Sequence, residues 1–466
     1  MKIAFLAPAG AMHRFNGSFG KSLHYAPLTL TTLAALIPPE LGAEAVLYDE
    51  TAEAIPLDLE ADLICITCIT GTAPRCYAYA DHFRRKGIAV VLGGVHPTLM
   101  PEEAAAHADS VVTGFAEFTF PQLLRDFARN QLKPLYRQGC DFTIAGRPTP
   151  RRELLNKKRY ITVNTLEAVR GCSLPCTFCA YPAAFGKTVY KRPVHEVIAE
   201  IEALNSKIVL FPDVNLIVDR VYAIELFTAM IPLKKFWLGL ATSAVGIDDA
   251  LVCVFRKSGC KGLLLGLESV NQESQKYVGK GVNKVGSYEE LMKKLHDAGI
   301  LVQGCFAFGA DNEDASTFER TVELVERAKI DLPRYSILTP FPNTQYYRQL
   351  EAEGRITERD WAMYDVEHCV YKPSLMTAGQ LMEGAAWAWR QTYKLGGVAK
   401  RLSPFVRDFW LSFPVNMGYR GYADKFTAFT KEVMCDNSDI DGGNQDEYLS
   451  YSARSGEQVS QVAERL

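Results

Sequence analysis

The sequence lacks three features that would place it at once in a common class of protein. No apolar run reaches the roughly 18–20 residues that a membrane-spanning helix needs. The 51 basic and 54 acidic side chains give a formal net charge of −3, too small to indicate a nucleic acid or an anionic membrane as partner. Residues 1–6 lead directly into a strand pattern, so we expect no signal peptide. Twelve cysteines without an export signal therefore predict a reducing cytoplasm.

A chain of 466 residues is long for a single hydrophobic core, so we expect several domains. Changes in hydrophobic pattern and composition set their boundaries. The segments are a doubly wound (Rossmann-like) α/β domain at 1–130, a polar connector at 131–158, a partial barrel at 159–355, a helical region at 356–435 and a polar tail at 436–466 that we expect to be disordered.

Short apolar runs rich in β-branched residues alternate with helical patterns in the first segment. Continuous apolar runs of this length are typical of strands that are buried on both faces of a parallel sheet. The alternation of strand and helix predicts a doubly wound parallel sheet, which binds ligands at the carboxyl ends of its strands. The expected strands are 2–7, 45–48, 62–67, 88–92 and 110–113.

Small and polar residues follow three of these strands. They are Thr67, Gly93, Gly94, Gly114 and Glu117. Glycines let a large flat ligand approach the backbone closely, although they can also serve only to turn the chain from strand to helix. His96 follows Gly94 closely, and it is either a group that caps the ligand or a plain surface residue.

The segment 159–355 carries a second series of strand–helix units. Such a series predicts a partial (βα)6 barrel of the TIM type, in which chemistry gathers at the carboxyl ends of the strands. The expected strands lie near 160–166, 208–211, 236–241, 262–267, 301–308 and 334–338.

Three cysteines follow the first expected barrel strand in the pattern C-x3-C-x2-C. They are Cys172, Cys176 and Cys179, in a loop that also contains Gly171 and Pro175. Three thiolates at this spacing can hold one cubane iron–sulfur cluster. No fourth cysteine follows at motif spacing, so one iron would stay open to a ligand from outside the protein. An open metal position is typical of a reactive site.

Two other interpretations of these cysteines remain open at this point. A closed zinc site also uses clustered cysteines, but it usually has two C-x2-C pairs or a histidine pair, and the nearest histidine here is His195. Free thiols can instead pack in a core as small apolar groups.

The three cysteines, with the aromatic Phe178 directly before the last one, resemble the motif of the radical S-adenosylmethionine (radical SAM) superfamily. The resemblance implies a [4Fe-4S] cluster whose open iron binds SAM, and cleavage of SAM to a 5′-deoxyadenosyl radical. It also implies SAM contacts from Phe178 and from later strand ends, where the matching positions are Asp213, Ser243, Glu268 and Gly304. For Asp213 and Glu268 the alternative role is a helix N-cap or a salt bridge.

The first domain resembles the cobalamin-binding domain that precedes many radical SAM enzymes. The resemblance rests on residues 93–98, 101–103 and 109–114, and it implies that the small and polar residues at the strand ends contact cobalamin. The chain departs from the family in two places. It has Gly114-Phe115-Ala116-Glu117 where the family usually has Gly-Glu-Gly-Glu, and it lacks the Asp-x-His-x-x-Gly motif that supplies a lower axial histidine elsewhere.

The resemblance implies a cobalamin-dependent methyltransferase that acts on an unactivated carbon of a natural-product, lipid or tetrapyrrole intermediate. The helical region 356–435 would close the barrel mouth. A reductant such as flavodoxin or ferredoxin and an anaerobic setting go with a cluster of this kind. Two alternatives stay open: a radical cyclase, oxidase or rearrangement enzyme without methyl transfer, and a non-catalytic iron–sulfur or zinc protein. The sequence does not choose the substrate, the oligomeric state or the electron donor.

Overall fold

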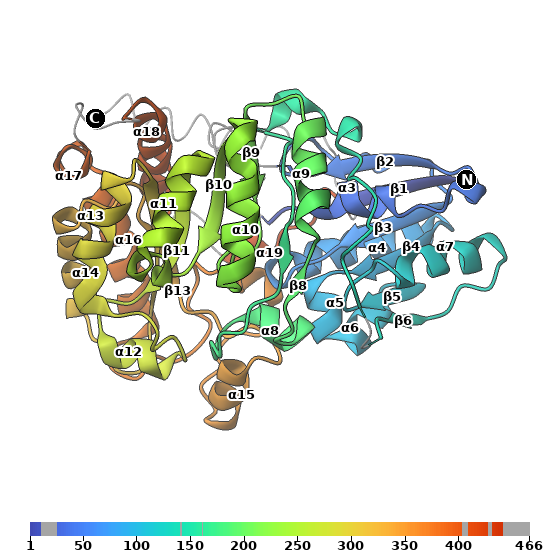
Figure 1. The fold of residues 1–466 in the computed structure, drawn as a ribbon. Coiled ribbons are helices and arrows are strands. Elements are labelled where there is room, and N and C mark those ends of the chain that lie inside the picture. The colour runs from blue at the N-terminus through green and yellow to red at the C-terminus, as the bar shows by residue number, and fades with distance from the viewer. Residues whose placement is uncertain (11–25, 140–141, 161, 403–408, 427–430, 441–466) are drawn as a thin grey trace, which may run out of the picture.

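The computed structural model of the chain describes residues 1–10, 26–139, 142–160, 162–402, 409–426 and 431–440. Its strands form two larger sheets that lie side by side (Figure 1). The N-terminal sheet is on the right of the view, and the barrel sheet lies toward the left. None of the helices in the described part of the chain combines the length and the apolar character that a membrane crossing requires.

The N-terminal sheet is parallel throughout, with the strand order β2-β1-β3-β4-β5-β6. The prediction of a doubly wound parallel sheet is therefore confirmed. The order reverses beside β1, and such a switch point opens a ligand crevice at the carboxyl ends of the strands. The strands are β1 (Lys2–Ala7), β2 (Glu44–Asp49), β3 (Leu63–Thr67), β4 (Ala89–Gly93), β5 (Ser110–Thr113) and β6 (Leu135–Arg137).

Helices cover both faces of this sheet, which explains why its central strands are apolar throughout. Phe5 and Leu6 are neighbours on β1 and both are fully buried, but Phe5 packs in the cluster with α3 and α7, and Leu6 in the cluster with α4. Successive side chains of a strand point to opposite faces, so each face needs its own apolar set. The helices are α3 (Leu28–Ala35), α4 (Ala73–Arg85), α5 (Val95–Leu99), α6 (Pro101–Ala106) and α7 (Thr119–Ala128).

The edge strand β6 lies inside the segment 131–158, which the sequence assigned to a connector. It pairs with β5, and its Tyr136 is buried while Leu135 and Arg137 are exposed. A strand of three residues is too short for its alternation to stand out within a polar segment. The segment that the sequence indicates as a connector therefore contributes a sixth strand, which the sequence analysis did not predict.

A second parallel sheet forms the open barrel, in the order β13-β12-β11-β10-β9. Its strands are β9 (Ile208–Phe211), β10 (Phe236–Ala241), β11 (Cys260–Glu268), β12 (Leu301–Phe308) and β13 (Arg334–Ile337). Figure 1 shows helices along its outer face; α9 (Val194–Ala203) precedes β9, and the helices between the later strands are α10 (Arg220–Met230), α11 (Asp249–Ser258), α12 (Gln272–Tyr277), α13 (Tyr288–Asp297) and α14 (Ser316–Arg327).

The prediction of a first barrel strand at 160–166 is wrong. The described part of this segment joins the sheet through an isolated parallel bridge between Thr165 and Leu210. The carbonyl oxygen of Thr165 accepts hydrogen bonds from the guanidinium of Arg152, with the Nε atom at 3.0 Å. Beside this bridge the amide of Leu166 donates to the carbonyl of Leu210 and the amide of Leu210 donates to the carbonyl of Asn164, both at 3.0 Å, so Arg152 satisfies a carbonyl outside this short pairing.

A short antiparallel hairpin follows this segment and carries the cysteines. It consists of β7 (Val169–Arg170) and β8 (Tyr190–Lys191). The cysteine loop, which we define as residues 171–179, and α8 (Ala180–Phe185) lie between these two strands. Figure 1 shows α8 beneath the junction of the two sheets.

The helical region after the barrel packs on its last strand. Trp389 of α16 is fully buried, and its ring centre lies 5.6 Å from that of Tyr335 on β13. This aromatic set therefore forms a core against the barrel. The helices are α15 (Gln345–Ala352), α16 (Ala378–Tyr393), α17 (Leu395–Arg401), α18 (Phe409–Lys425) and α19 (Lys431–Cys435).

Residues 436–440, which the sequence assigned to a disordered tail, are folded against the N-terminal domain. Ile440 is buried in the cluster of β3 and α4, and the Nη2 atom of Arg75 donates to Asp439 Oδ2 at 2.7 Å. Arg75 and its second partner Glu50 are buried as well. The polar composition around Ile440 hid this contact, so the prediction of disorder is wrong here. The rest of the predicted tail, 441–466, lies outside the described residues.

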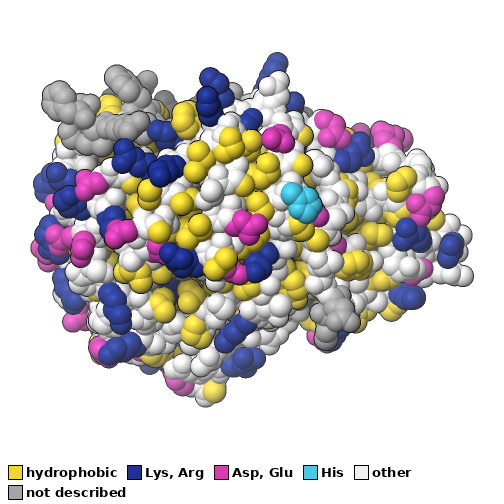
Figure 2. Space-filling model, viewed as in Figure 1, with side chains coloured by type: hydrophobic (Ala, Val, Ile, Leu, Met, Phe, Trp, Pro, Cys, Tyr) yellow, Lys and Arg dark blue, Asp and Glu magenta, His cyan; other side chains and the backbone are white. Residues whose placement is uncertain are grey.

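Charged side chains of both signs are interspersed on the face shown in Figure 2. Basic side chains over the left part of that view lie beside acidic ones. This mixture agrees with the small net charge of −3, and it gives that face no field of a single sign.

Candidate active site between the sheet and the barrel

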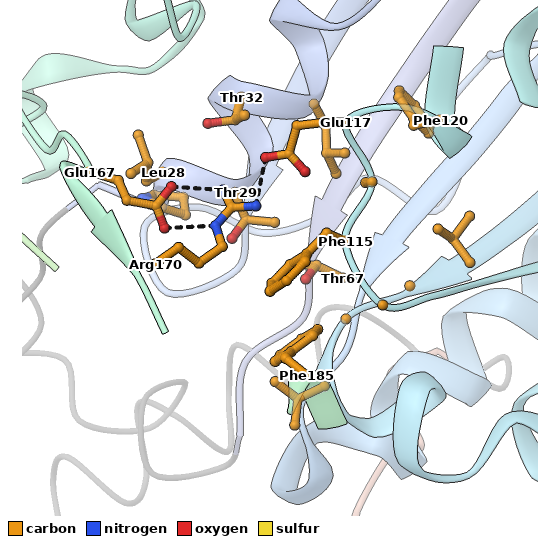
Figure 3. Close-up of a pocket in the computed structure, with 18 of the residues that line it drawn as sticks. Leu28, Thr29, Thr32, Thr67, Phe115, Glu117, Phe120, Glu167, Arg170 and Phe185 are labelled. Atoms are coloured by element: carbon orange, nitrogen blue, oxygen red, sulfur yellow. Dashed lines mark hydrogen bonds and ion pairs between the residues drawn. The ribbon is translucent and has the colours of Figure 1, made fainter. Parts of the chain in front are cut away.

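A cavity of about 480 Å³ lies between the N-terminal sheet and the start of the barrel (Figure 3). Residues that follow β3, β4 and β5 line it from one side. Residues beside the cysteine loop and after β9 line it from the other. The strand ends of the two sheets therefore share one space. Several residues that the sequence singled out line this cavity: Thr67, Gly93, Gly94, Gly114, Glu117 and Asp213.

The glycines at the strand ends serve two purposes. Gly94 and Gly114 have φ values of +112° and +79°, which favour glycine. A Cβ atom at Gly94 would lie 2.7 Å from the carbonyl oxygen of Cys68, so the turn itself requires a glycine. Gly93 has ordinary room for a side chain. Together the three glycines leave this wall of the cavity without side chains, which fits the cobalamin that the resemblance implies.

The structure does not bring His96 into the cavity. Its side chain is fully buried, and its Nε2 and Nδ1 atoms lie 3.3 Å from Glu103 Oε1 and 3.3 Å from Thr70 Oγ1. Its ring centre lies 5.4 Å from that of Trp361, in the segment after α15. His96 is therefore neither a surface residue nor part of the cavity wall. It links the N-terminal domain to the region after the barrel.

The cysteine loop is held in place by backbone contacts on two sides. The amide of Thr177 donates to the carbonyl of Val278 at 3.0 Å, and its carbonyl accepts from the amide of Tyr346 at 3.0 Å. Gly279 has a φ of +75°, and a Cβ atom there would collide with the backbone of the loop. The end of α12 and the start of α15 therefore fix where the thiols lie.

All three thiols of the loop are free and half-buried. Burial raises the pKa of Cys176 to about 11, against the opposing charge of Lys280, and it raises the pKa of Cys179 as well. Cys176 and Cys179 therefore keep their protons until a metal displaces them. In the part of the chain that the structure describes, no three Cys, His, Asp or Glu side chains gather around a position for one ion. A donor set of three thiols in one loop fits an iron–sulfur cluster.

Asp213 places one unused oxygen atom at the cavity wall. Its Oδ1 atom accepts from the amides of Ala168, at 2.9 Å, and Val169. Its Oδ2 atom is buried and has no hydrogen-bond partner among the described residues. Burial, helped by the charge of Glu167, raises the pKa of Asp213 to about 8. An orphaned carboxylate oxygen here fits the ammonium group of SAM, whereas the N-cap and salt-bridge alternatives do not describe what Asp213 does.

Ser243 and Glu268 already have partners within the barrel. The hydroxyl of Ser243 donates to Asn283 Oδ1 at 2.6 Å. Glu268 has a positive φ of +60° and forms an ion pair with Lys280. The salt-bridge alternative for Glu268 is therefore present in the structure. The charges of both partners act on the thiols of the cysteine loop, so the pair lies close to them.

The side chain that Gly304 lacks would face away from the barrel interior. A Cβ atom there would lie 3.0 Å from Leu267 and 3.0 Å from Ile330, both in the barrel core. This glycine therefore makes room for packing, and its contact with SAM stays a prediction. Phe178 is partly buried and packs against the same core.

The sequence analysis missed Arg170, directly before the cysteine loop. Its guanidinium donates to Glu117 Oε1 at 2.6 Å and to Glu167 Oε2 at 2.7 Å, and lies 4.8 Å from the ring centre of Phe115 (Figure 3). Burial opposes the charge of Glu167, but Arg170 and Arg147 hold the pKa of that carboxyl below its ordinary value. Glu117 is thus committed to a protein partner. A pairing across 53 residues leaves no local signal in the sequence.

The comparisons with known proteins agree with this geometry. Residues 166–325 match the Radical SAM superfamily, and residues 37–124 match the B12 binding domain. The chain is 30% identical over 396 residues to the bacteriochlorophyllide d C-12(1)-methyltransferase of Chlorobaculum tepidum, which covers 81% of this chain and 84% of that relative. The chain belongs to the radical SAM superfamily. The two domain matches confirm the predicted cofactors of this radical SAM enzyme, a [4Fe-4S] cluster and SAM from the first and cobalamin from the second.

Two further relatives extend the comparison. The bacteriochlorophyllide d C-8(2)-methyltransferase of the same organism is 32% identical over 368 residues, which covers 74% of this chain and 80% of that relative. A solved structure of the cobalamin-dependent SAM radical enzyme OxsB, with aqua-cobalamin and SAM bound, has a TM-score of 0.66. It is 15% identical and covers 91% of this chain and 71% of that chain, so it supports the fold. Family membership sets aside the non-catalytic and zinc alternatives. The roles of individual site residues stay predictions.

Proposed function

We propose that this radical SAM enzyme transfers a methyl group to an unactivated carbon of a tetrapyrrole macrocycle. The support for this substrate class comes from the two bacteriochlorophyllide d methyltransferases, because this chain aligns with 84% and 80% of their lengths. Both alignments are longer than the segment 166–325 that matches the Radical SAM superfamily, so they extend beyond that domain.

The observation that carries the proposal is one cavity that the strand ends of the sheet share with Asp213 and with Arg170 and Gly171, which directly precede Cys172. When bound, the cluster supplies the electron for SAM cleavage, and cobalamin carries the methyl group. In this proposal, Cys172, Cys176 and Cys179 hold the cluster, and Asp213 Oδ2 accepts a hydrogen bond from the ammonium of SAM. The bare strand end at Gly93 leaves room for the corrin ring on the opposite wall. A substrate carbon in this space would lie between the two cofactors, as methyl transfer to a carbon radical requires.

The rim of the cavity suits a flat apolar ligand. Ile69, after β3, is 57% exposed, and Val214, after β9, is 41% exposed, although both are large apolar side chains. Both line the cavity, one from each sheet. Exposed apolar side chains around a concave site are typical of a surface that a ligand covers.

The test is an anaerobic assay of the reconstituted enzyme with bacteriochlorophyllide d, hydroxocobalamin, methyl-labelled SAM and dithionite as the source of electrons. We expect a product with one labelled methyl group, together with S-adenosylhomocysteine and 5′-deoxyadenosine in similar amounts. The variant C176A is the control and should form neither nucleoside product.

Each other outcome identifies a different activity. Substrate-dependent 5′-deoxyadenosine without S-adenosylhomocysteine would replace methyl transfer by a radical cyclisation, oxidation or rearrangement. A parallel assay replaces bacteriochlorophyllide d by a lipid extract. Labelled methyl in the lipid, together with an unchanged tetrapyrrole in the first assay, would overturn the proposed substrate class.

We further propose that a low-potential protein such as flavodoxin or ferredoxin supplies the electron in the cytoplasm. An open cluster is reached by small one-electron donors because its ligand loop is only half-buried. Replacement of dithionite by reduced flavodoxin in the same assay should retain formation of 5′-deoxyadenosine. A dependence on dithionite alone would argue against this class of donor.

A further inference from the structure

One side chain ties the N-terminal sheet to the cysteine loop. Arg170 directly precedes the cysteine loop, and its Nη1 atom donates to Glu117 Oε1 at 2.6 Å. Glu117 belongs to the loop that follows β5, so the bond joins the two halves of the cavity wall (Figure 3). The two side chains are 14% and 8% exposed, so water competes little for this ion pair.

Aromatic contacts make a second connection between the same two loops. The ring centre of Phe115 lies 4.8 Å from that of Phe185, at an interplanar angle of 9°, and 4.8 Å from the guanidinium carbon of Arg170. Phe185 ends α8, which begins directly after Cys179. Both ends of the cysteine loop, Arg170 before it and Phe185 after α8, therefore contact the loop that follows β5.

The chain departs from its family at this position, since Phe115 stands where the usual motif has a glutamate. A glutamate there would place a third carboxylate beside Glu117 and Glu167, which share Arg170. The phenylalanine instead offers a ring face to the guanidinium, an arrangement that is favourable in a desolvated site. The substitution therefore strengthens the contact between the two loops.

We propose that Arg170, with Glu117 and Phe115, couples the two cofactor sites, so that cobalamin binds more tightly when the cluster is in place. Cobalamin on the sheet side would order the loop after β5, and that loop holds both ends of the cysteine loop. Once one cofactor has ordered these loops, the second cofactor binds without the entropy cost of ordering them. By linkage, cobalamin must retain the cluster to the same degree. The inference rests on the two cofactors and not on the identity of the substrate.

The test is a titration with hydroxocobalamin, followed by absorbance, of anaerobic protein with the cluster reconstituted and with the iron removed. In the wild type we expect the Kd to be at least about fivefold lower with the cluster, as for a typical coupling between two sites. E117Q removes the charge of the bond across the cavity while Arg170 keeps Glu167, so the cluster should still load. We expect the ratio of the Kd without the cluster to the Kd with the cluster to fall toward one in E117Q.

This ratio separates coupling from general damage to the fold. A merely structural loss would weaken cobalamin binding in both forms and leave their ratio unchanged. F115L, which keeps an apolar side chain but removes the ring face, should lower the ratio partly. E40Q is the matched control, because Glu40 forms an exposed ion pair with Arg125 in the same domain. A wild-type ratio of one, or an E117Q ratio equal to that of E40Q, would overturn the proposal.

Discussion

The ammonium of Lys280 and the carboxylate of Glu268 form an ion pair that is nearly closed to water beside the cysteine loop. Their side chains are 10% and 14% exposed. Gly266 makes room for both groups, since a Cβ atom there would collide with each of them. The backbone of Glu268 has a φ of +60°, which a non-glycine residue adopts only where its surroundings hold it.

Replacement of Lys280 by methionine leaves the charge of Glu268 buried without its partner. We expect K280M to lower the free energy of unfolding by about 3 kcal/mol, and the double variant E268Q/K280M to recover most of this loss. Urea denaturation followed by tryptophan fluorescence measures both. The exposed pair of Lys276 and Glu273 is the control, and K276M should change stability by less than about 1 kcal/mol. Equal free energies of unfolding for K280M and K276M would refute a stabilising role of the Lys280–Glu268 ion pair.

Asp213 makes stability depend on pH in the direction opposite to most carboxylates. Its pKa in the folded protein is about 8, above the value of 3.8 for a free side chain, because burial disfavours the charged form. The folded state therefore binds a proton more tightly, and stability falls as the pH rises from about 4 to about 8. D213N keeps the Oδ1 acceptor and removes the titration. Urea denaturation should find D213N more stable than the wild type near the upper pH of this range but not near the lower pH. The same difference in the free energy of unfolding at both pH values would contradict this.

Cys176 should be needed for the retention of iron, because a cubane with one open iron already depends on three protein thiols. We expect C176A to lose most of its iron and its visible absorbance after anaerobic reconstitution. Cys253 on α11 is exposed and serves as the control, so C253A should retain both. Iron analysis decides the matter, and full iron content in C176A would remove Cys176 from the cluster site.

The contact between Asp439 and Arg75 should stabilise the N-terminal domain. Arg75 is 4% exposed and donates to Asp439 at 2.7 Å. The variant D439N therefore leaves the buried guanidinium with Glu50 as its remaining carboxylate partner. We expect a loss of about 2 kcal/mol in the free energy of unfolding. Asp58, an exposed residue of the same domain, provides the control variant D58N. If D439N unfolded with the same urea midpoint as D58N, the contact would have no energetic role.

Much of the fold could be predicted because its signals are local. The strands around Phe5 and Leu6 are apolar on both faces, and only a sheet covered by helices on both sides explains that pattern. The three cysteines carry their chemistry in their spacing. The failures occur where distant groups decide the structure. The described part of 160–166 joins the barrel sheet through one bridge, between Thr165 and Leu210, which lie far apart in the sequence.

The candidate site was predicted in part for the same reason. Gly94 and Gly114 occupy turns that follow buried strands, so their place at the cavity wall follows from local pattern. His96 is different, because its burial depends on Glu103 and Trp361, the latter from a segment far along the chain. Arg170 was missed because its partner Glu117 is 53 residues away, and ion pairs over such separations appear only once the two sheets meet.

The docking of residues 436–440 has a consequence for synthesis of the protein. The N-terminal domain leaves the ribosome before residues 436–440 do, and domains generally fold as they emerge. Arg75 and the pocket that receives Ile440 are nevertheless completed by residues near the end of the chain. The N-terminal domain is therefore completed only after residues 436–440 have been made. Until Asp439 has been made, Arg75 lacks one of its two carboxylate partners.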